Sequence, residues 1–134
     1  MRSLKRVALV CLLAAAIVLP AAAAELGVQK SSSGGVTVAV TPQNLVASAK
    51  SWDFKVVLDT HSGELNDDLV KTATLIDDKG SRHVPVKWEG AGPGGHHREG
   101  TLSFSAIAPR PGAVELQIQR LDESKPRSFR WQLK

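Results

Sequence analysis

The feature of this sequence that most restricts its fold is a series of short segments in which apolar and polar residues alternate. The clearest segment is 51–60, where every second residue is apolar: Trp52, Phe54, Val56 and Leu58. A period of two places such residues on one face of a half-buried strand. No segment of similar length shows a helical period, although 65–70 (LNDDLV) could form one helical turn. The pattern therefore predicts an all-β fold.

Seven such segments follow one another along the chain, with turn residues between them. They cover residues 36–40, 51–60, 70–76, 82–88, 101–107, 113–121 and 128–133. The connections carry Gly, Pro and Asp, as in 77–80 (DDKG) and 109–112 (PRPG), and Pro85 marks its segment as an edge strand. We predict a seven-stranded, immunoglobulin-like antiparallel sandwich. A cupredoxin-like arrangement or a small barrel is the second interpretation.

The first 24 residues resemble a secretory signal peptide rather than a part of the fold. Three positive charges lie in residues 1–6, an apolar run covers 7–19, and Pro20 and four alanines follow. We expect cleavage after Ala22 or Ala24; an uncleaved anchor is the alternative, although the apolar run is short for a membrane span. The expected product is periplasmic or secreted and has no stable membrane insertion. Residues 25–35 are polar and rich in Gly and Ser, which predicts a flexible leader before a domain at 36–134.

Removal of the signal peptide changes the inventory of cysteines and charges. The single cysteine, Cys11, lies inside the apolar run, so the mature chain forms no disulfide, which excludes a disulfide-bonded immunoglobulin domain. The full chain has a net charge of +4, but three of its 17 basic residues and none of its 13 acidic ones lie in the signal, which leaves +1. A nearly neutral domain lacks the concentrated basic face that nucleic-acid binding requires, so we expect no nucleic-acid partner.

Histidines supply the candidate site. His61 follows the strand predicted at 51–60, and His96 and His97 lie in the glycine-rich segment GPGGHHREG. In an antiparallel sandwich, successive connections alternate between the two ends, so we expect these loops at the same end. Asp59 and Glu99 are the nearest carboxylates in the sequence. Imidazoles and carboxylates from separate loops are ligands for Zn²⁺ or Cu²⁺, so the five residues form a candidate divalent transition-metal site.

Two other interpretations compete with the metal site. The histidines and their neighbours could simply be solvated or fasten the loops by hydrogen bonds, in a structural or protein-interaction domain without a ligand. Catalysis is disfavoured: Asp59, His61 and Ser62 have the composition of a triad, but residues so close in sequence would not face one another. We therefore expect a binding module and not an enzyme.

The segments VVLDTHSGEL and VPVKWEGAGPGGHHREGTLSF resemble a group of small exported bacterial proteins of unassigned function. The resemblance covers about residues 56–104, and LDTHS and GGHHR are its distinctive parts. It implies that the two histidine loops act together, and it implies no particular activity.

Overall fold

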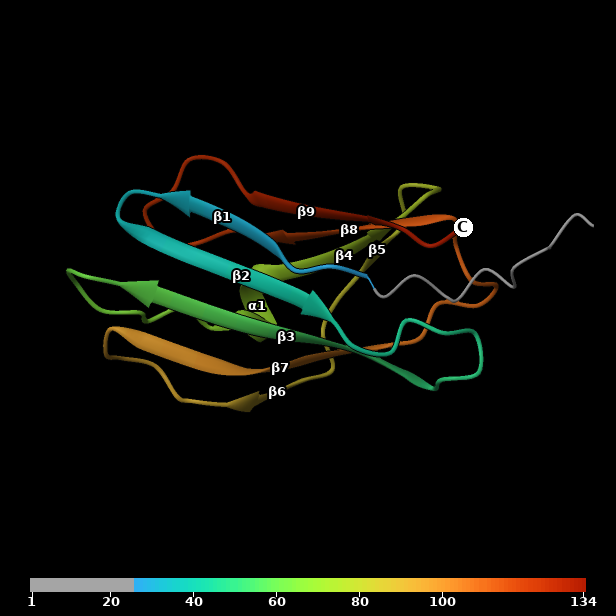
Figure 1. The fold of residues 1–134 in the computed structure, drawn as a ribbon, viewed down its shortest axis with the longest axis horizontal. Coiled ribbons are helices and arrows are strands. Elements are labelled where there is room, and N and C mark those ends of the chain that lie inside the picture. Colours follow the sequence, from blue (N-terminus) through green and yellow to red (C-terminus); the bar gives the residue numbers. More distant parts are fainter. Residues whose placement is uncertain (1–25) are drawn as a thin grey trace, which may run out of the picture.

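Two antiparallel β-sheets face each other in the computed structural model, which describes residues 26–134 (Figure 1). The first sheet has the order β1 (Gln29–Ser33), β2 (Val36–Pro42), β3 (Ser51–Thr60), β7 (His97–Ser105) and β6 (Lys87–Gly90). The second has the order β5 (Arg82–His83), β4 (Ala73–Asp77), β8 (Ala113–Ile118) and β9 (Arg127–Gln132). One short helix, α1 (Leu69–Thr72), precedes β4. The predicted signal peptide and Cys11 lie outside the described residues.

The core lies between the two sheets and follows the predicted alternation. The four apolar residues that alternate along β3 are all 0 % exposed. Phe54 of β3 contacts Phe104 of β7 edge to face, with ring centroids 5.7 Å apart, and lies 5.6 Å from the ring of Trp131 on β9. Because β9 belongs to the opposite sheet, these aromatic contacts join the two layers. The all-β prediction is confirmed.

Residues 26–134 form nine strands, where the sequence predicted seven, and the first difference lies in the expected flexible leader. Residues 29–33 (QKSSS) form β1, which pairs with β2 along its whole length. Gly34 and Gly35 have φ angles of +56° and +77°, which allows the two-residue turn between these strands. β1 is an edge strand with little buried side-chain surface, so hydrophobic periodicity could not reveal it.

The second difference lies at 82–88, which was predicted to be one strand, in which the alternation places Val84, Val86 and Trp88 on one face. That prediction is wrong: β5 pairs with β4 in one sheet, β6 pairs with β7 in the other, and the chain crosses between them. Pro85 is buried at this crossing, whereas Val84 and Val86 are 73 % and 58 % exposed. A crossing of this kind interrupts the alternation, because the residues at the bend belong to neither sheet face.

The segment predicted as a strand at 70–76 also divides into two elements. Its first part is α1, which Asp68 caps by accepting a hydrogen bond from the Val70 N–H at 3.2 Å. Its second part is β4. No helix in the described part of the chain is long and apolar enough to cross a membrane.

Candidate functional site

The two loops that carry the histidines, 61–66 and 91–96, lie side by side at one end of the sandwich. The Thr60 N–H donates to the His96 carbonyl at 2.9 Å and continues the ladder between β3 and β7. Further along, the Leu65 N–H donates to the Gly95 carbonyl at 3.1 Å, and the Gly94 N–H donates to the Leu65 carbonyl at 2.9 Å. These main-chain hydrogen bonds fix the loops to each other. We call these two loops together the histidine pole.

Gly94 and Gly95 explain the glycine content of the second loop. Their φ angles of +109° and +78° lie in the region that residues with a side chain rarely adopt. The backbone can therefore curl so that both residues pair with Leu65. The glycines shape the loop, while the side chains of His61 and His96 remain exposed.

Three of the five predicted site residues are in contact with one another. The His97 Nδ1 atom lies 2.5 Å from Asp59 Oδ1, across the register of β3 and β7, and its Nε2 atom lies 3.5 Å from Glu99 Oε2. Glu99 also pairs with Lys55 at 2.8 Å. All four side chains lie about half exposed on the outer face of the first sheet. They form a row of alternating charge that we call the outer row.

Hydrogen bonding sets the protonation states within the outer row. The hydrogen bond to Asp59, together with the charge of that carboxylate, raises the pKa of His97 above its usual value, and Glu99 acts in the same direction. The Lys55 ammonium, through its hydrogen bond and charge, lowers the pKa of Glu99. The arrangement therefore favours a positively charged imidazole between two negative carboxylates.

This geometry is unlike a metal centre. Each ring nitrogen of His97 faces a different carboxylate, so the ligand atoms surround the ring instead of converging on one point. Within residues 26–134, no group of three or more His, Cys, Asp or Glu side chains is positioned to hold a metal ion. His61 and His96 belong to the histidine pole, but they are not part of the outer-row contacts.

The histidine pole rests on Arg98, a guanidinium that is 2 % exposed. Arg98 donates to main-chain carbonyls of both loops, to Leu65 at 3.3 Å and to Ala91 at 3.1 and 3.3 Å. It also donates to the carbonyl of Asp67, directly after the first loop, at 2.6 Å. Its guanidinium carbon also lies 5.7 Å from the centre of the Trp88 ring. One buried side chain therefore joins the two loops of the histidine pole from beneath.

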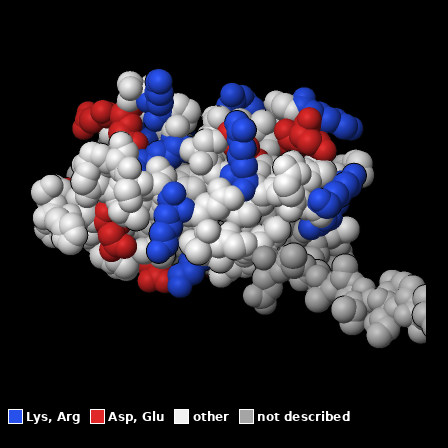
Figure 2. Space-filling view, turned by 45° about the horizontal axis from the view of Figure 1, so that its top comes forward, with Lys and Arg blue, Asp and Glu red and all other residues white. Residues whose placement is uncertain are grey.

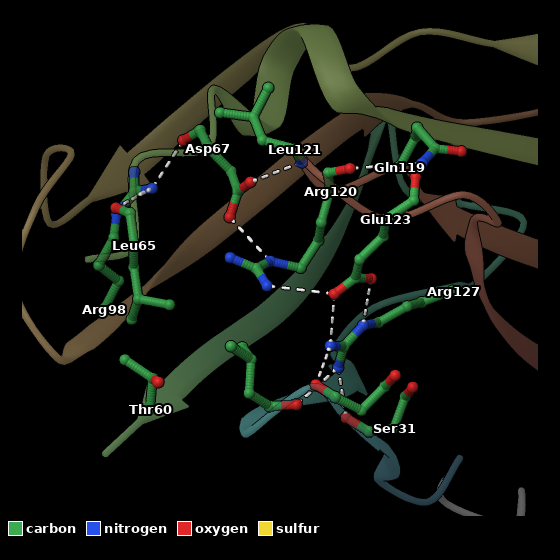
Figure 3. A network of polar contacts seen from close by, with 12 residues as sticks. Ser31, Thr60, Leu65, Asp67, Arg98, Gln119, Arg120, Leu121, Glu123 and Arg127 are labelled. Atoms are coloured by element: carbon green, nitrogen blue, oxygen red, sulfur yellow. Dashed lines mark hydrogen bonds and ion pairs between the residues drawn. The ribbon is translucent and has the colours of Figure 1, made fainter. Parts of the chain in front are cut away.

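Beside Arg98, a chain of largely buried ion pairs links the segment before α1 to the β8–β9 connection and the start of β9 (Figure 3). The Asp67 side chain, 1 % exposed, accepts from Arg120 Nε at 3.0 Å and from the Leu121 N–H at 3.3 Å. Arg120 also pairs with Glu123 at 3.2 Å, and Glu123 pairs with Arg127 at 2.8 Å. Two carboxylates and two guanidiniums balance in charge, and every link is a charge-assisted hydrogen bond.

Arg127 ends this chain under the turn between β1 and β2. Its guanidinium donates to the carbonyls of Ser31, Val36 and Ser33 at 2.7, 2.9 and 2.9 Å. The hydrogen bond from Arg127 to Glu123 lowers the pKa of that carboxyl. The network therefore joins β9 of the second sheet to the β1–β2 turn of the first and supports the end of the sandwich where the histidine pole lies.

This network was not predicted, although two signals in the sequence indicate it. Leu65, Asp67 and Leu69 are spaced by two residues and are all buried, so Asp67 occupies an interior position of an apolar alternation. Arg98 shares the inward parity of Leu102 and is likewise buried. A charged residue at an apolar position of a period-two pattern indicates a buried pair.

No protein-family model matches the chain, and no curated protein matches it. Among solved structures, the fold is similar to the crystal structure of a DUF4426 family protein from Pseudomonas aeruginosa PAO1, with a TM-score of 0.51. The two proteins are 16 % identical, and the match covers 78 % of this chain and 94 % of that one. At this level of identity the similarity concerns the fold alone.

Proposed function

We propose that this protein is an exported, non-enzymatic binding module whose recognition surface for a protein partner is the histidine pole. The observation that supports the proposal is the combination of exposed imidazoles with a fixed backbone. His61 and His96 are exposed, while the loops that carry them are joined by main-chain hydrogen bonds and by buried Arg98. A surface that is already ordered loses little conformational entropy when a partner binds.

A binding role fits these residues better than catalysis. A general base needs a ring nitrogen that is free to accept a proton. Both nitrogens of His97 already face carboxylates, and the short contact with Asp59 favours the protonated ring. Within the described residues, the other imidazole–carboxylate pair is His83 with Asp77 at 3.0 Å, in the second sheet.

The strand order supports the finer proposal of an immunoglobulin-like sandwich. The order β2-β3-β7-β6 corresponds to strands A, B, E and D of that fold, and β4-β8-β9 corresponds to C, F and G. In variable immunoglobulin domains, loops at one end of the sandwich carry the binding surface. The histidine pole contains the connections that follow strands B and D, at one end of the molecule.

Site-specific photo-crosslinking tests the proposed surface. A photoreactive amino acid would replace His96 at the pole, or Lys79 in the β4–β5 turn as an exposed control. We expect a defined protein adduct in the exported fraction from position 96 and none from position 79. Equal adducts from both positions, or no adduct from position 96, would contradict the proposed surface.

A bound Zn²⁺ or Cu²⁺ is the second candidate, because His61 and His96 are exposed on two loops that hydrogen-bond to each other. A metal that binds only the native state stabilises it and raises the melting temperature. The stabilisation is about 2.7 kcal/mol when the free metal concentration is a hundred times Kd. The metal proposal therefore expects a rise with Zn²⁺ or Cu²⁺ that His61→Ala removes. An unchanged melting temperature with both metals would eliminate it and leave the protein-binding role.

A further inference from the structure

A polar groove lies between the β1–β2 turn and the start of β9, where the edges of the two sheets approach each other. It has a volume of about 590 Å³ and is open to solvent. Its lining comes from two segments: Ser31, Ser33 and Gly34 on one side, and residues 122–128 on the other. Figure 1 shows β1 and β9 side by side, although they belong to different sheets. We call the space between them the seam.

A side chain, and not a strand, closes the seam at its other end. The amide of Gln29 accepts a hydrogen bond from the Arg130 N–H at 2.9 Å and donates one to the Arg130 carbonyl. This pair of bonds reproduces what a neighbouring strand would give to one residue of β9. The Trp131 indole N–H donates to the Gly27 carbonyl at 2.9 Å and adds a further contact across the seam. A side-chain amide therefore stands in for the missing strand.

The bonds to Gln29 also show which backbone groups of β9 point outward. Opposite residues of an antiparallel pair alternate between bonded and unbonded positions. The Leu133 N–H donates to Gly112 in the β8–β9 register, so the odd-numbered residues of β9 bond β8. The main-chain N–H and C=O groups of Arg130 and Ser128 therefore point away from β8. Those of Ser128 face the groove, because Ser128 is part of its lining. The main chain of β9 is thus open to pairing at the end of the seam where Gln29 does not reach.

The same alternation applies to β1 on the other side of the seam. The Gln43 N–H donates to the Asp53 carbonyl, so the odd-numbered residues of β2 bond β3 and the even-numbered ones bond β1. Their partners on β1 are odd-numbered, which leaves the main-chain groups of Lys30 and Ser32 pointing away from β2. Both edges of the seam therefore carry outward main-chain groups.

The charges around the seam favour an acidic ligand. Lys30 and Lys125 are exposed along it, and Arg130 is exposed but pairs with Glu115 at 2.9 Å. The Glu123 carboxylate in the groove is already paired with two arginines. Asp122 is an exposed acid beside these cations. Figure 2 shows several Lys and Arg side chains standing out from this side of the molecule, with fewer acidic ones between them.

We propose that the seam binds an extended, acidic peptide segment of a partner protein by strand addition to β9. The segment pairs first with Ser128 in the groove and then displaces the Gln29 amide from Arg130, while its carboxylates face the exposed cations. Main-chain hydrogen bonds provide affinity in this binding mode, and the side chains provide selectivity. The groove lies at the same end of the sandwich as the histidine pole but shares no lining residue with it, so the proposal does not depend on the function proposed for that surface.

The test uses a capped hexapeptide of alternating Glu and Val and protein produced from the full-length chain. Ser128→Pro removes an outward N–H without removing a bond to β8, and we expect it to weaken binding about tenfold. Ser32→Pro makes the matched change on β1 and should leave binding unchanged. Gln29→Ala frees Arg130 and should strengthen binding. Peptide titrations followed by fluorescence anisotropy give these affinities.

Two altered peptides complete the experiment and keep it decisive if a protein variant folds poorly. A version with methylated backbone nitrogens and a version with Lys in place of Glu should each bind about tenfold more weakly to the unmodified protein. Equal binding of all three peptides would overturn the proposal, as would binding that Ser128→Pro does not change. A dimer of this chain that Ser128→Pro dissociates, seen by analytical ultracentrifugation, would instead assign the β9 edge to a second copy.

Discussion

Replacing Asp67 by Asn should destabilise the protein strongly, although the two side chains have nearly the same size and shape. The change keeps the shape of the side chain but removes the charge that pairs with Arg120 at 3.0 Å, at a position where Asp67 is 1 % exposed. Breaking a buried ion pair costs about 3–5 kcal/mol. Arg120 retains Glu123, and the new amide oxygen still accepts from the Leu121 N–H, so we expect the lower end, about 3 kcal/mol.

Urea denaturation followed by tryptophan fluorescence measures this change, because Trp52 is 0 % exposed and reports on the core. The melting temperature should fall by roughly 10–20 °C for a domain of this size. Asp68→Asn is the matched control: the neighbouring aspartate is exposed, caps α1 and makes only an exposed ion pair with Lys71, so the change should cost about 1 kcal/mol or less. Equal costs for the two variants would refute the view that the buried pair with Arg120 supports this end of the sandwich.

Two further predictions concern packing and pH. Gly100→Ala should lower the free energy of unfolding by about 1–3 kcal/mol, because its Cβ would lie 2.6 Å from the Trp88 ring; Gly92→Ala, which meets nothing within 4 Å, should be neutral in the same urea assay. The raised folded-state pKa of His97 means that its pairing with Asp59 stabilises the fold below the unfolded pKa of about 6.5, and that this contribution is lost as the pH rises through the folded pKa. His97→Gln should therefore flatten the pH dependence of the urea midpoint between about pH 5 and 9, and an identical pH profile in both proteins would contradict this assignment.

Much of the sandwich could be predicted because burial imposes a period of two on its central strands. β3 matches its predicted range of 51–60, and the core residues of β8 and β9 face inward as their alternation indicates. Elements that hide little apolar surface escaped prediction. β1 is held by main-chain pairing with β2. The chain around Pro85 pairs first with β4 of one sheet and then with β7 of the other. Neither segment therefore has a regular hydrophobic pattern.

The candidate site shows a similar division. Sequence patterns supplied the residues, and the β3–β7 register brings Asp59, His97 and Glu99 into contact. The pattern could not supply the direction of each ring nitrogen, which depends on the pairing of His97 with its neighbours on two strands. It also could not reveal that Arg98 binds carbonyls instead of a carboxylate, because main-chain acceptors have no signature in the sequence.

The way Arg98 holds the two loops has a consequence for how this protein can change. Its acceptors are carbonyl oxygens, which every amino acid possesses, so the clamp is indifferent to the side chains displayed above it. Mutations at the tips, such as at His61 or His96, can therefore alter the surface that we propose for binding while the supporting framework stays intact. Libraries randomised at these tips, with Arg98 and the two glycines that bend the loop held constant, should therefore yield folded proteins with varied surfaces.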